Sequence, residues 1–269
     1  DGGWHHLILL SSNKQAYLQE HSAFGKVILP GIAYPLIMTA VADAHWEGTT
    51  VDFRNIQIVH PLFLDKDKTL HAFVTPIENG EYRFSLRTTA EKSDGEWMIH
   101  AEGILDPQAK SQPSSLTLEQ AKARCTQEEP IQTFHDIIGE TEVEWGPGWY
   151  WSTSMALGKG AGLMEIQVPE GAANDGPLHP TMFDNGIGFA MSLPVLGKVI
   201  DETEAVMQLP FAFEIVRWRG LPTQTSWCYA EVIEAGLETS RFELRYWDDA
   251  GNVILEIDGF VSKQALREA

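Results

Sequence analysis

Two kinds of hydrophobic pattern alternate along the chain. Over residues 30–45 the apolar side chains recur at the three- and four-residue spacing of a helix, and Pro30 suits the first helical turn. The stretches that follow are rich in β-branched and aromatic residues, and turn signals such as Asn79-Gly80 separate them. The pattern predicts one helix and then four strands, at residues 51–59, 69–76, 81–89 and 97–105.

The second half of the chain repeats this order. Pro180 opens an apolar stretch at residues 182–193, which predicts a second, largely buried helix. Pro180 follows Pro30 by 150 residues. Gly259 follows Gly103 by 156 residues, so the spacing is nearly constant, and we interpret the chain as a duplication. Four strands are predicted after the second helix, at residues 207–218, 227–235, 241–246 and 253–262.

A stretch rich in Pro, Gln and Ser at residues 106–115 separates the two repeats, as linkers do, and residues 116–124 favour a helix. We therefore divide the chain into an N-terminal unit at 1–108, a linker at 109–128 and a C-terminal unit at 129–269. Each unit has too few strands to close its own sheet. We expect the two sheets to pair edge to edge, with both helices on the same side, in an α+β fold.

Composition and charge narrow the possible partners. The chain has 269 residues, 43% of them hydrophobic, and 19 Lys and Arg against 38 Asp and Glu, which gives a net charge of −19. A globule of this size buries a large core, and its charge disfavours nucleic acid and anionic lipid. No run of about 18 apolar residues predicts a membrane span, and the first residues do not resemble a signal peptide. Two cysteines, Cys125 and Cys228, are too few for a disulfide framework, so we expect the reducing cytoplasm.

Two residues are candidates for acid–base chemistry. His21 lies in a glycine-punctuated loop before the first helix, where it could act as a general base, although a loop histidine bonded to backbone is the plainer alternative. Asp184 lies among apolar residues of the second helix, where desolvation would raise its pKa and keep a proton available. Its alternative is a first-turn aspartate bonded to free helix N–H groups, weighed about evenly. His179 and Asp175 compete for any role near Asp184.

Other chemistries lack their residues. The sequence has no metal-ligand spacing around these positions, so no metal is expected. Glycines at 158, 160 and 162 predict a hairpin turn rather than a phosphate loop, because no Lys-Ser/Thr follows. No nucleophile elbow is present. Aromatic residues at 145 and 149–151 favour core or pocket wall over a sugar-binding platform.

Four landmarks, in order, resemble the dehydratase domains of polyketide synthases. His21, Gly25 and Pro30 match the HxxxGxxxxP motif, which continues into Gly31. The stretch LHPTMFD ends at Asp184, the position of that family's acid. GPGW at residues 146–149 resembles the GPxF element, and LPFAF at residues 209–213 resembles the LPF strand.

This resemblance implies a double hot-dog fold, in which two helix-wrapped-by-sheet units form one pseudo-dimer with the site between them. His21 would remove the α-proton of a β-hydroxyacyl thioester, and Asp184 would protonate the departing hydroxyl, giving syn loss of water to the enoyl thioester. No cofactor is implied. The substrate would arrive on the phosphopantetheine of an acyl carrier protein, next to other domains of a multidomain synthase and in a homodimer. The implied substrate-binding residues are Gly25, Pro30, Gly31, Pro147, Trp149, Gly188 and Phe211.

Four positions depart from the family pattern. The DxxxQ/H motif that begins at Asp184 ends in Gly188, whose missing side chain is expected to leave space beside the acid. Val143 and Trp145 replace the usual tyrosines, and Trp149 replaces the phenylalanine of GPxF. Relatives of this fold also isomerise enoyl double bonds, close pyran or furan rings by oxa-Michael addition, or branch chains vinylogously. These reactions, an inactive structural domain and an unrelated ligand-binding protein stay open as alternatives.

Overall fold

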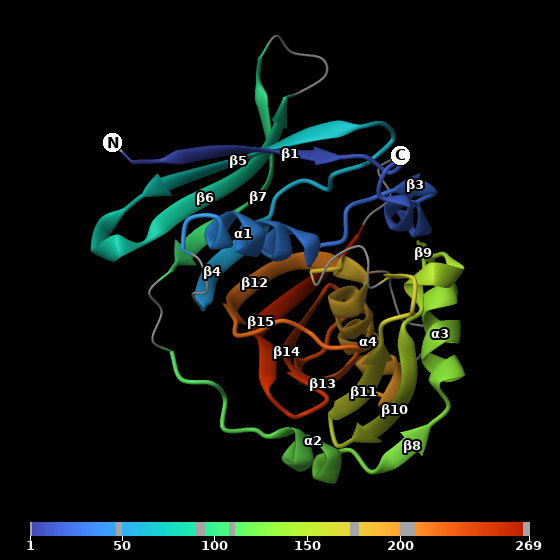
Figure 1. The fold of residues 1–269 in the computed structure, drawn as a ribbon. Coiled ribbons are helices and arrows are strands. Elements are labelled where there is room, and N and C mark those ends of the chain that lie inside the picture. The colour runs from blue at the N-terminus through green and yellow to red at the C-terminus, as the bar shows by residue number, and fades with distance from the viewer. Residues whose placement is uncertain are drawn as a thin grey trace.

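The computed structural model describes residues 2–46, 50–89, 95–107, 111–172, 178–199 and 208–265. Figure 1 shows that the first half of the chain forms one group of strands with a helix, and that the second half forms another beside it. The first half forms β1 (Trp4–Leu10), η1 (Ala16–Glu20), β2 (His21–Ala23), β3 (Lys26–Val27), α1 (Ala33–Asp43), β4 (Val51–Ile58), β5 (Lys68–Pro76), η2 (Glu78–Gly80), β6 (Tyr82–Thr89) and β7 (Trp97–Asp106).

The second half contains the same helix-then-strands order behind a longer lead. It forms α2 (Leu118–Arg124), β8 (Gln127–Glu129), α3 (Ile131–Gly139), β9 (Val143–Trp145), η3 (Pro147–Trp149), β10 (Ser152–Gly158), β11 (Ala161–Gln167), α4 (Pro180–Leu196), β12 (Gln208–Trp218), β13 (Thr225–Glu234), β14 (Thr239–Asp248) and β15 (Val253–Gln264). Both central helices and all eight predicted strands are present. The hairpin predicted at residues 158–162 is the β10–β11 connection.

Twelve strands form one sheet in the order β1-β5-β6-β7-β4-β12-β15-β14-β13-β11-β10-β8. The two halves meet where β4 pairs antiparallel with β12, for example at Phe53↔Val216, so the expected edge-to-edge pairing is confirmed. A buried ion pair, Arg219 Nη1 to Asp52 Oδ1 at 2.8 Å, crosses the same junction. The boundary expected at residues 108 and 109 lies outside the described residues, and the division into units at 108 and 129 stays a prediction.

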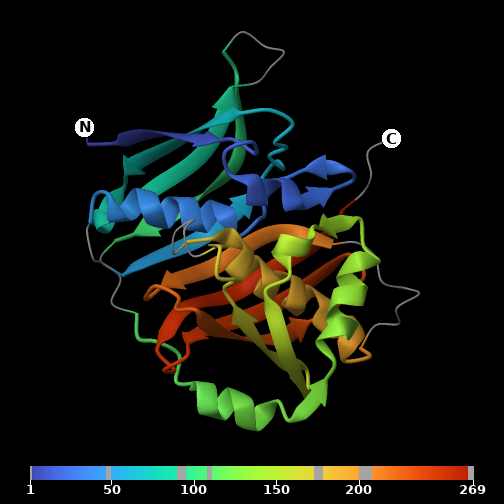
Figure 2. The same cartoon turned by 45° about the vertical axis from the view of Figure 1, so that its right-hand side comes forward.

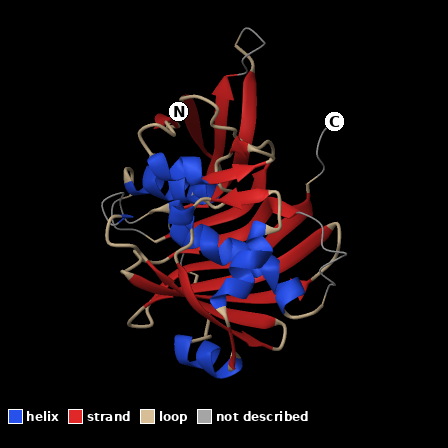
Figure 3. Cartoon of the chain, turned by 90° about the vertical axis from the view of Figure 1, so that its right-hand side faces the viewer, coloured by secondary structure: helices blue, strands red, loops and turns tan. Residues whose placement is uncertain are grey.

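The central helices α1 and α4, together with α3, lie on one side of this sheet, as Figures 2 and 3 show, whereas α2 packs apart from them in a small cluster with Ala161, Leu163 and Tyr229. The apolar faces of α1 and α4 pack there into one continuous core with residues from both halves. Gly186 allows α4 to lie close to β13 and β14, because a Cβ at this position would stand 2.6 Å from the sulfur of Cys228. The Tyr246 hydroxyl donates to the carbonyl oxygen of Phe183 at 2.7 Å and fixes the same turn of the helix. No described helix is long and apolar enough to cross a membrane.

A second, three-stranded sheet, β3-β2-β9, lies beside the helices and joins residues 120 positions apart. Its β2–β3 hairpin turns through Phe24 and Gly25, which have φ values of 54° and 71°. Two consecutive positive φ values are typical of a type I′ turn and favour glycine at the second position. β2 pairs with β9 so that His21 stands opposite Trp145. This small sheet thus connects the first half to the segment that precedes α4.

Candidate active site

His21 begins β2 and is 7% exposed. Its Nδ1 lies 2.9 Å from the carbonyl oxygen of Ile28, across the hairpin. Because a carbonyl only accepts, Nδ1 carries a hydrogen, and Nε2 of the neutral ring is left with a lone pair. The backbone contact therefore does not compete with a role as a base, since it orients the nitrogen that would act.

Asp184 is the fifth residue of α4 and is 4% exposed. Its Oδ2 accepts a hydrogen bond from Trp149 Nε1 at 3.0 Å and lies 3.4 Å from His21 Nε2. Burial raises the pKa of Asp184, while His21 and the Trp149 donor partly oppose that rise. The carboxyl lies beyond the first helical turn, where His179 already caps the helix by accepting from the Thr181 N–H. The partners of its carboxylate are the side chains of Trp149 and His21, so the alternative of a first-turn aspartate bonded to free helix N–H groups does not describe this residue.

Asn185 supports the site, and the sequence analysis did not identify it. Its Oδ1 accepts from the N–H groups of Trp151 and Ser152, each at 3.1 Å. Its Nδ2 donates to the carbonyl oxygens of Trp149 at 2.7 Å and Thr181 at 2.9 Å. The amide therefore uses both donors and both lone pairs to tie α4 to the segment that carries Trp149. An amide residue within an otherwise apolar helical stretch, directly after Asp184, is the sequence signal that could have identified Asn185.

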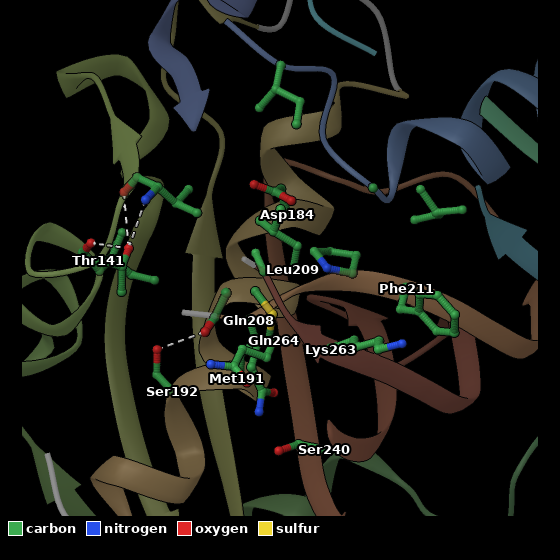
Figure 4. Close-up of a pocket in the computed structure, with 18 of the residues that line it drawn as sticks. Thr141, Asp184, Met191, Ser192, Gln208, Leu209, Phe211, Ser240, Lys263 and Gln264 are labelled. Carbon is green, nitrogen blue, oxygen red and sulfur yellow. Dashed lines mark hydrogen bonds between the residues drawn. The ribbon is translucent and has the colours of Figure 1, made fainter. Parts of the chain in front are cut away.

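The pair opens into a cavity of about 340 Å³. The cavity follows α4 from Asp184 to Val195, with α3, β9, the start of β12 and the end of β15 as further walls of the second half. The first half closes it with the β2–α1 segment, Tyr34 of α1 and the end of β4. Figure 4 shows Asp184 at one end, Ser240 at the other, and Phe211 with Lys263 together to one side. The lining is mostly apolar, and the volume is in the range of small-molecule sites.

The sequence-predicted residues divide into two groups. His21, Asp184, Gly31, Gly188 and Phe211 line the cavity. Gly31 also brings the two halves together, since a Cβ there would lie 2.5 Å from Pro210 Cβ.

The other predicted residues shape the surroundings and are not among the cavity-lining residues. Gly25 forms the hairpin turn, Pro30 is buried ahead of α1, and Pro147 is an exposed residue that begins η3. Trp149 is fully buried, with its ring centroid 5.1 Å from that of His21.

The expected open space at Gly188 is filled. A Cβ at Gly188 would stand 2.9 Å from Trp145 Cη2 and 3.4 Å from Ile138 Cδ1. The indole of Trp145 therefore lies where a side chain at position 188 would go. This expectation was wrong because the β2–β9 pairing, which brings Trp145 next to His21, has no periodic signature in so short a strand.

The competing residues have other surroundings. The His179 ring packs between Tyr17 and Trp151, with centroids 4.2 Å and 4.6 Å away, and does not line the cavity. Asp175 lies outside the described residues. Within the described ranges, no group of three or more His, Cys, Asp or Glu side chains could hold a metal ion.

The site places a side chain that can accept a proton, His21, next to one that can donate a proton, Asp184. The raised pKa of Asp184 favours its protonated carboxyl, and this carboxyl beside a neutral His21 makes a pair that avoids a buried charge. Such a pair can remove one proton and deliver another on the same side of a bound molecule.

Comparison with known sequences gives consistent matches. Residues 113–269 match the family described as polyketide synthase dehydratase N-terminal domain, and residues 3–89 match the polyketide synthase dehydratase domain. Polyketide synthase PksM of Bacillus subtilis (strain 168) is 23% identical over 260 residues, covering 90% of this chain and 6% of PksM. Spectinabilin polyketide synthase system protein NorB of Streptomyces orinoci is 23% identical, covering 94% and 11%. The chain therefore spans about a tenth or less of these relatives.

Solved structures share the fold. The dehydratase domain from the CurJ module of curacin polyketide synthase has a TM-score of 0.84 at 20% identity, covering 98% of this chain and 92% of that one. A trans-AT polyketide synthase dehydratase domain from Brevibacillus brevis has a TM-score of 0.81 at 17% identity, covering 98% and 94%. These likenesses confirm the double hot-dog fold. Because the match over residues 113–269 covers more than half of the chain, the chain belongs to the polyketide synthase dehydratase family.

Proposed function

We propose that this domain removes water from a β-hydroxyacyl thioester, with His21 as the general base and Asp184 as the general acid. The observation that carries the proposal is the separation of 3.4 Å between His21 Nε2 and Asp184 Oδ2 at the wall of an apolar cavity. Two variants of the related CurK dehydratase, one with a histidine replaced by phenylalanine and one with an aspartate replaced by asparagine, are described as inactive. That description agrees with a histidine–aspartate mechanism.

The proposed step balances without a cofactor. His21 Nε2 takes the α-proton and leaves the Cα–H electron pair in the thioester enolate. That pair then forms the Cα=Cβ bond as the Cβ–O bond breaks and Asp184 gives its proton to the departing hydroxyl. Water and the enoyl thioester leave, and a proton returns from His21 to Asp184 to reset the pair. Because both groups are adjacent, removal and delivery on one face of the substrate are favoured, which means syn elimination.

The proposed carrier of the substrate is the phosphopantetheine arm of an acyl carrier protein. Lys263 is the lysine among the cavity-lining residues, with its Nζ 5.1 Å from the centroid of the exposed Phe211 ring. A cation over an apolar surface at the cavity wall suits an arm that ends in a phosphate. The free cysteines Cys125 and Cys228 suit a cytoplasmic synthase, whose neighbouring domains would flank this one.

A homodimer is also proposed, through the edge strand β1. This strand ends the twelve-stranded sheet and exposes Leu7 by 65% and Leu9 by 50%. An exposed apolar edge strand favours pairing with a second copy.

The filled wall beside Gly188 supports a second candidate, an enoyl isomerase or cyclase on the same pair of residues. Trp145 narrows the cavity next to the acid, where the family has a polar side chain. The deciding experiment incubates the domain with a β-hydroxyacyl pantetheine thioester and with the matching enoyl thioester. The products are separated by chromatography and read by mass spectrometry and NMR, since a double-bond shift or ring closure leaves the mass unchanged. Loss of 18 mass units supports dehydration. A shifted double bond or an intramolecular adduct without water loss supports the second candidate, and unchanged substrate contradicts both.

A further inference from the structure

Glu20, the residue before His21, accepts two backbone N–H groups of the η3 turn, one through its backbone carbonyl and one through its side chain. The Gly146 N–H donates to the carbonyl oxygen of Glu20 at 2.8 Å, and the Gly148 N–H donates to the Glu20 carboxylate. Pro147 has no N–H, and the Trp149 N–H donates to the Gly146 carbonyl at 2.9 Å. Glu20 therefore binds both outward donors of this turn.

The two glycines of the turn are required for room. Neither has a positive φ, so an L side chain would be tolerated by the backbone itself. A Cβ at Gly146 would lie 2.8 Å from Glu20 Cβ, and a Cβ at Gly148 would lie 2.7 Å from Glu20 Oε2. The GPG sequence thus allows the turn to close around the Glu20 side chain.

The turn leads directly to the reacting groups. Trp149, its last residue, donates its indole N–H to Asp184 Oδ2 at 3.0 Å. Glu20 is followed in sequence by His21, whose ring centroid lies 5.1 Å from that of Trp149. Glu20 therefore links the segment that carries His21 to the turn that carries the donor to Asp184.

We propose that Glu20 is a positioning residue for the His21–Asp184 pair, which holds the Gly146–Trp149 turn against β2 so that the Trp149 indole stays aligned on Asp184. The kinetic part of this inference rests on the proposed dehydratase function, whereas the alignment of the indole does not.

The consequence for titration follows from the groups that face Asp184. These are His21 from β2, the Trp149 N–H from η3, and the Tyr246 ring from β14. The Trp149 hydrogen bond favours the charged carboxylate and lowers its pKa. Loss of the alignment should therefore raise the pKa of Asp184. Since the reaction uses the protonated acid, the alkaline limb of the kcat profile should move to higher pH.

The test compares Glu20→Ala and Glu20→Gln with a matched control, Glu144→Ala. Glu144 lies on the same small sheet, one pair along from His21, and accepts from the exposed Ser22 hydroxyl at 3.0 Å without contact to the turn. Two readouts are collected from the whole domain: kcat and KM against pH with a β-hydroxyacyl pantetheine thioester, and the NMR titration of the Trp149 indole N–H, assigned with Trp149→Phe.

We expect Glu20→Ala to lower kcat by about 10- to 100-fold, as a misalignment of about 1 Å does, with KM changed less than threefold. The Trp149 resonance should shift and titrate at higher pH. Glu20→Gln keeps an acceptor oxygen and should stay within about threefold of wild type, and Glu144→Ala should match wild type. An unchanged Trp149 resonance and titration in Glu20→Ala would overturn the proposal, whatever the turnover.

A second route keeps the proposal testable if Glu20→Ala does not fold. Gly148→Ala should displace the Glu20 carboxylate and reproduce the shift of the indole resonance, and a normal resonance in this variant would also contradict the proposal. Where both single variants fold, Gly148→Ala should add little in the Glu20→Ala background, because the clash is gone; fully additive losses would show that the two residues act separately. If wild-type protein shows no turnover, the proposed dehydratase function is refuted. The NMR titration of the Trp149 indole would still test whether Glu20 aligns that indole on Asp184.

Discussion

The two central helices occupy equivalent places in the duplication but contribute different chemistry. Pro30 ahead of α1 and Pro180 at the start of α4 are 150 residues apart, and the same offset relates Tyr34 to Asp184. Both of these side chains are buried and line the cavity. Burial raises the pKa of either group, but a phenol then stays neutral at every ordinary pH, whereas a carboxyl is brought toward the range where it can exchange a proton.

The helices also differ one turn later. Met38 of α1 is fully buried, while its counterpart in α4 is Gly188, which is covered by Trp145. In the proposed mechanism, the first unit supplies the base from a hairpin ahead of its helix, and the second unit supplies the acid from within its helix. The comparison indicates that duplication provides two similar scaffolds, and that the reaction depends on the differences between them.

The largest expected effect is on the base from the first unit. His21→Ala should lower turnover about 10²- to 10⁴-fold while the domain stays folded, because the removed nitrogen acts on the transition state. The measurement is water loss by mass spectrometry, with circular dichroism as the check on folding. His135→Ala is the matched control, since His135 is half-buried and bonded to Ser152 outside the cavity lining. A turnover within tenfold of wild type in His21→Ala would exclude His21 as the base.

The next effect tests the difference between Met38 and Gly188. Gly188→Gln should lower the free energy of unfolding by about 1–3 kcal/mol and turnover about tenfold, because the new side chain meets the Trp145 ring. Trp145→Val should rescue both quantities in the double variant. Urea unfolding and kcat measure the two effects. If Gly188→Gln alone is as stable and active as wild type, Trp145 does not fill that space in solution.

A smaller effect concerns stability against pH. The raised pKa of Asp184 means that the folded state binds this proton more tightly than the unfolded chain, so stability should fall as pH rises above the unfolded value near 3.8. Asp184→Asn removes this penalty. We expect the variant to be more stable than wild type at pH 7 and to lose that advantage toward pH 4. Denaturant unfolding at both pH values measures the difference in free energy of unfolding between Asp184→Asn and wild type. The same difference at pH 7 and pH 4 would contradict the raised pKa.

The smallest effect is expected at the counterpart of the acid. Tyr34→Phe should change turnover by less than about threefold, because the neutral phenol has no proton-transfer role in the proposed step. The same mass-spectrometric assay measures it. A tenfold loss would mean that α1 also contributes a reacting group, and the asymmetry between the helices would have to be revised.

Much of this fold could be predicted because its main elements are long and periodic. The α4 helix extends three residues past the predicted stretch, and β12 to β15 begin or end within two residues of the ranges expected within the described part of the chain. The strand β1 was not predicted because His5 and His6 interrupt its alternation of apolar and polar residues. The amphipathic helix α3 was not predicted because its nine residues give only a short helical period.

The site could be predicted only in part. His21 and Asp184 were identified from local sequence, because a loop histidine and a buried acid each stand out where they occur. The roles of Asn185 and Glu20 and the position of Trp145 depend on contacts between distant segments. One example is the β2–β9 pairing, whose strands are too short to give a periodic pattern in the sequence. The expected space beside Gly188 was wrong for the same reason.

The most direct test of the central claim separates the acid from the base in one variant. Asp184→Asn is incubated in D₂O with a β-hydroxyacyl pantetheine thioester, alongside His21→Ala, and both deuterium gain and water loss are read by mass spectrometry. The account predicts that Asp184→Asn gains deuterium at Cα through His21 without losing water, and that His21→Ala does neither. Water loss at the wild-type rate in Asp184→Asn, or deuterium gain in His21→Ala, would contradict it.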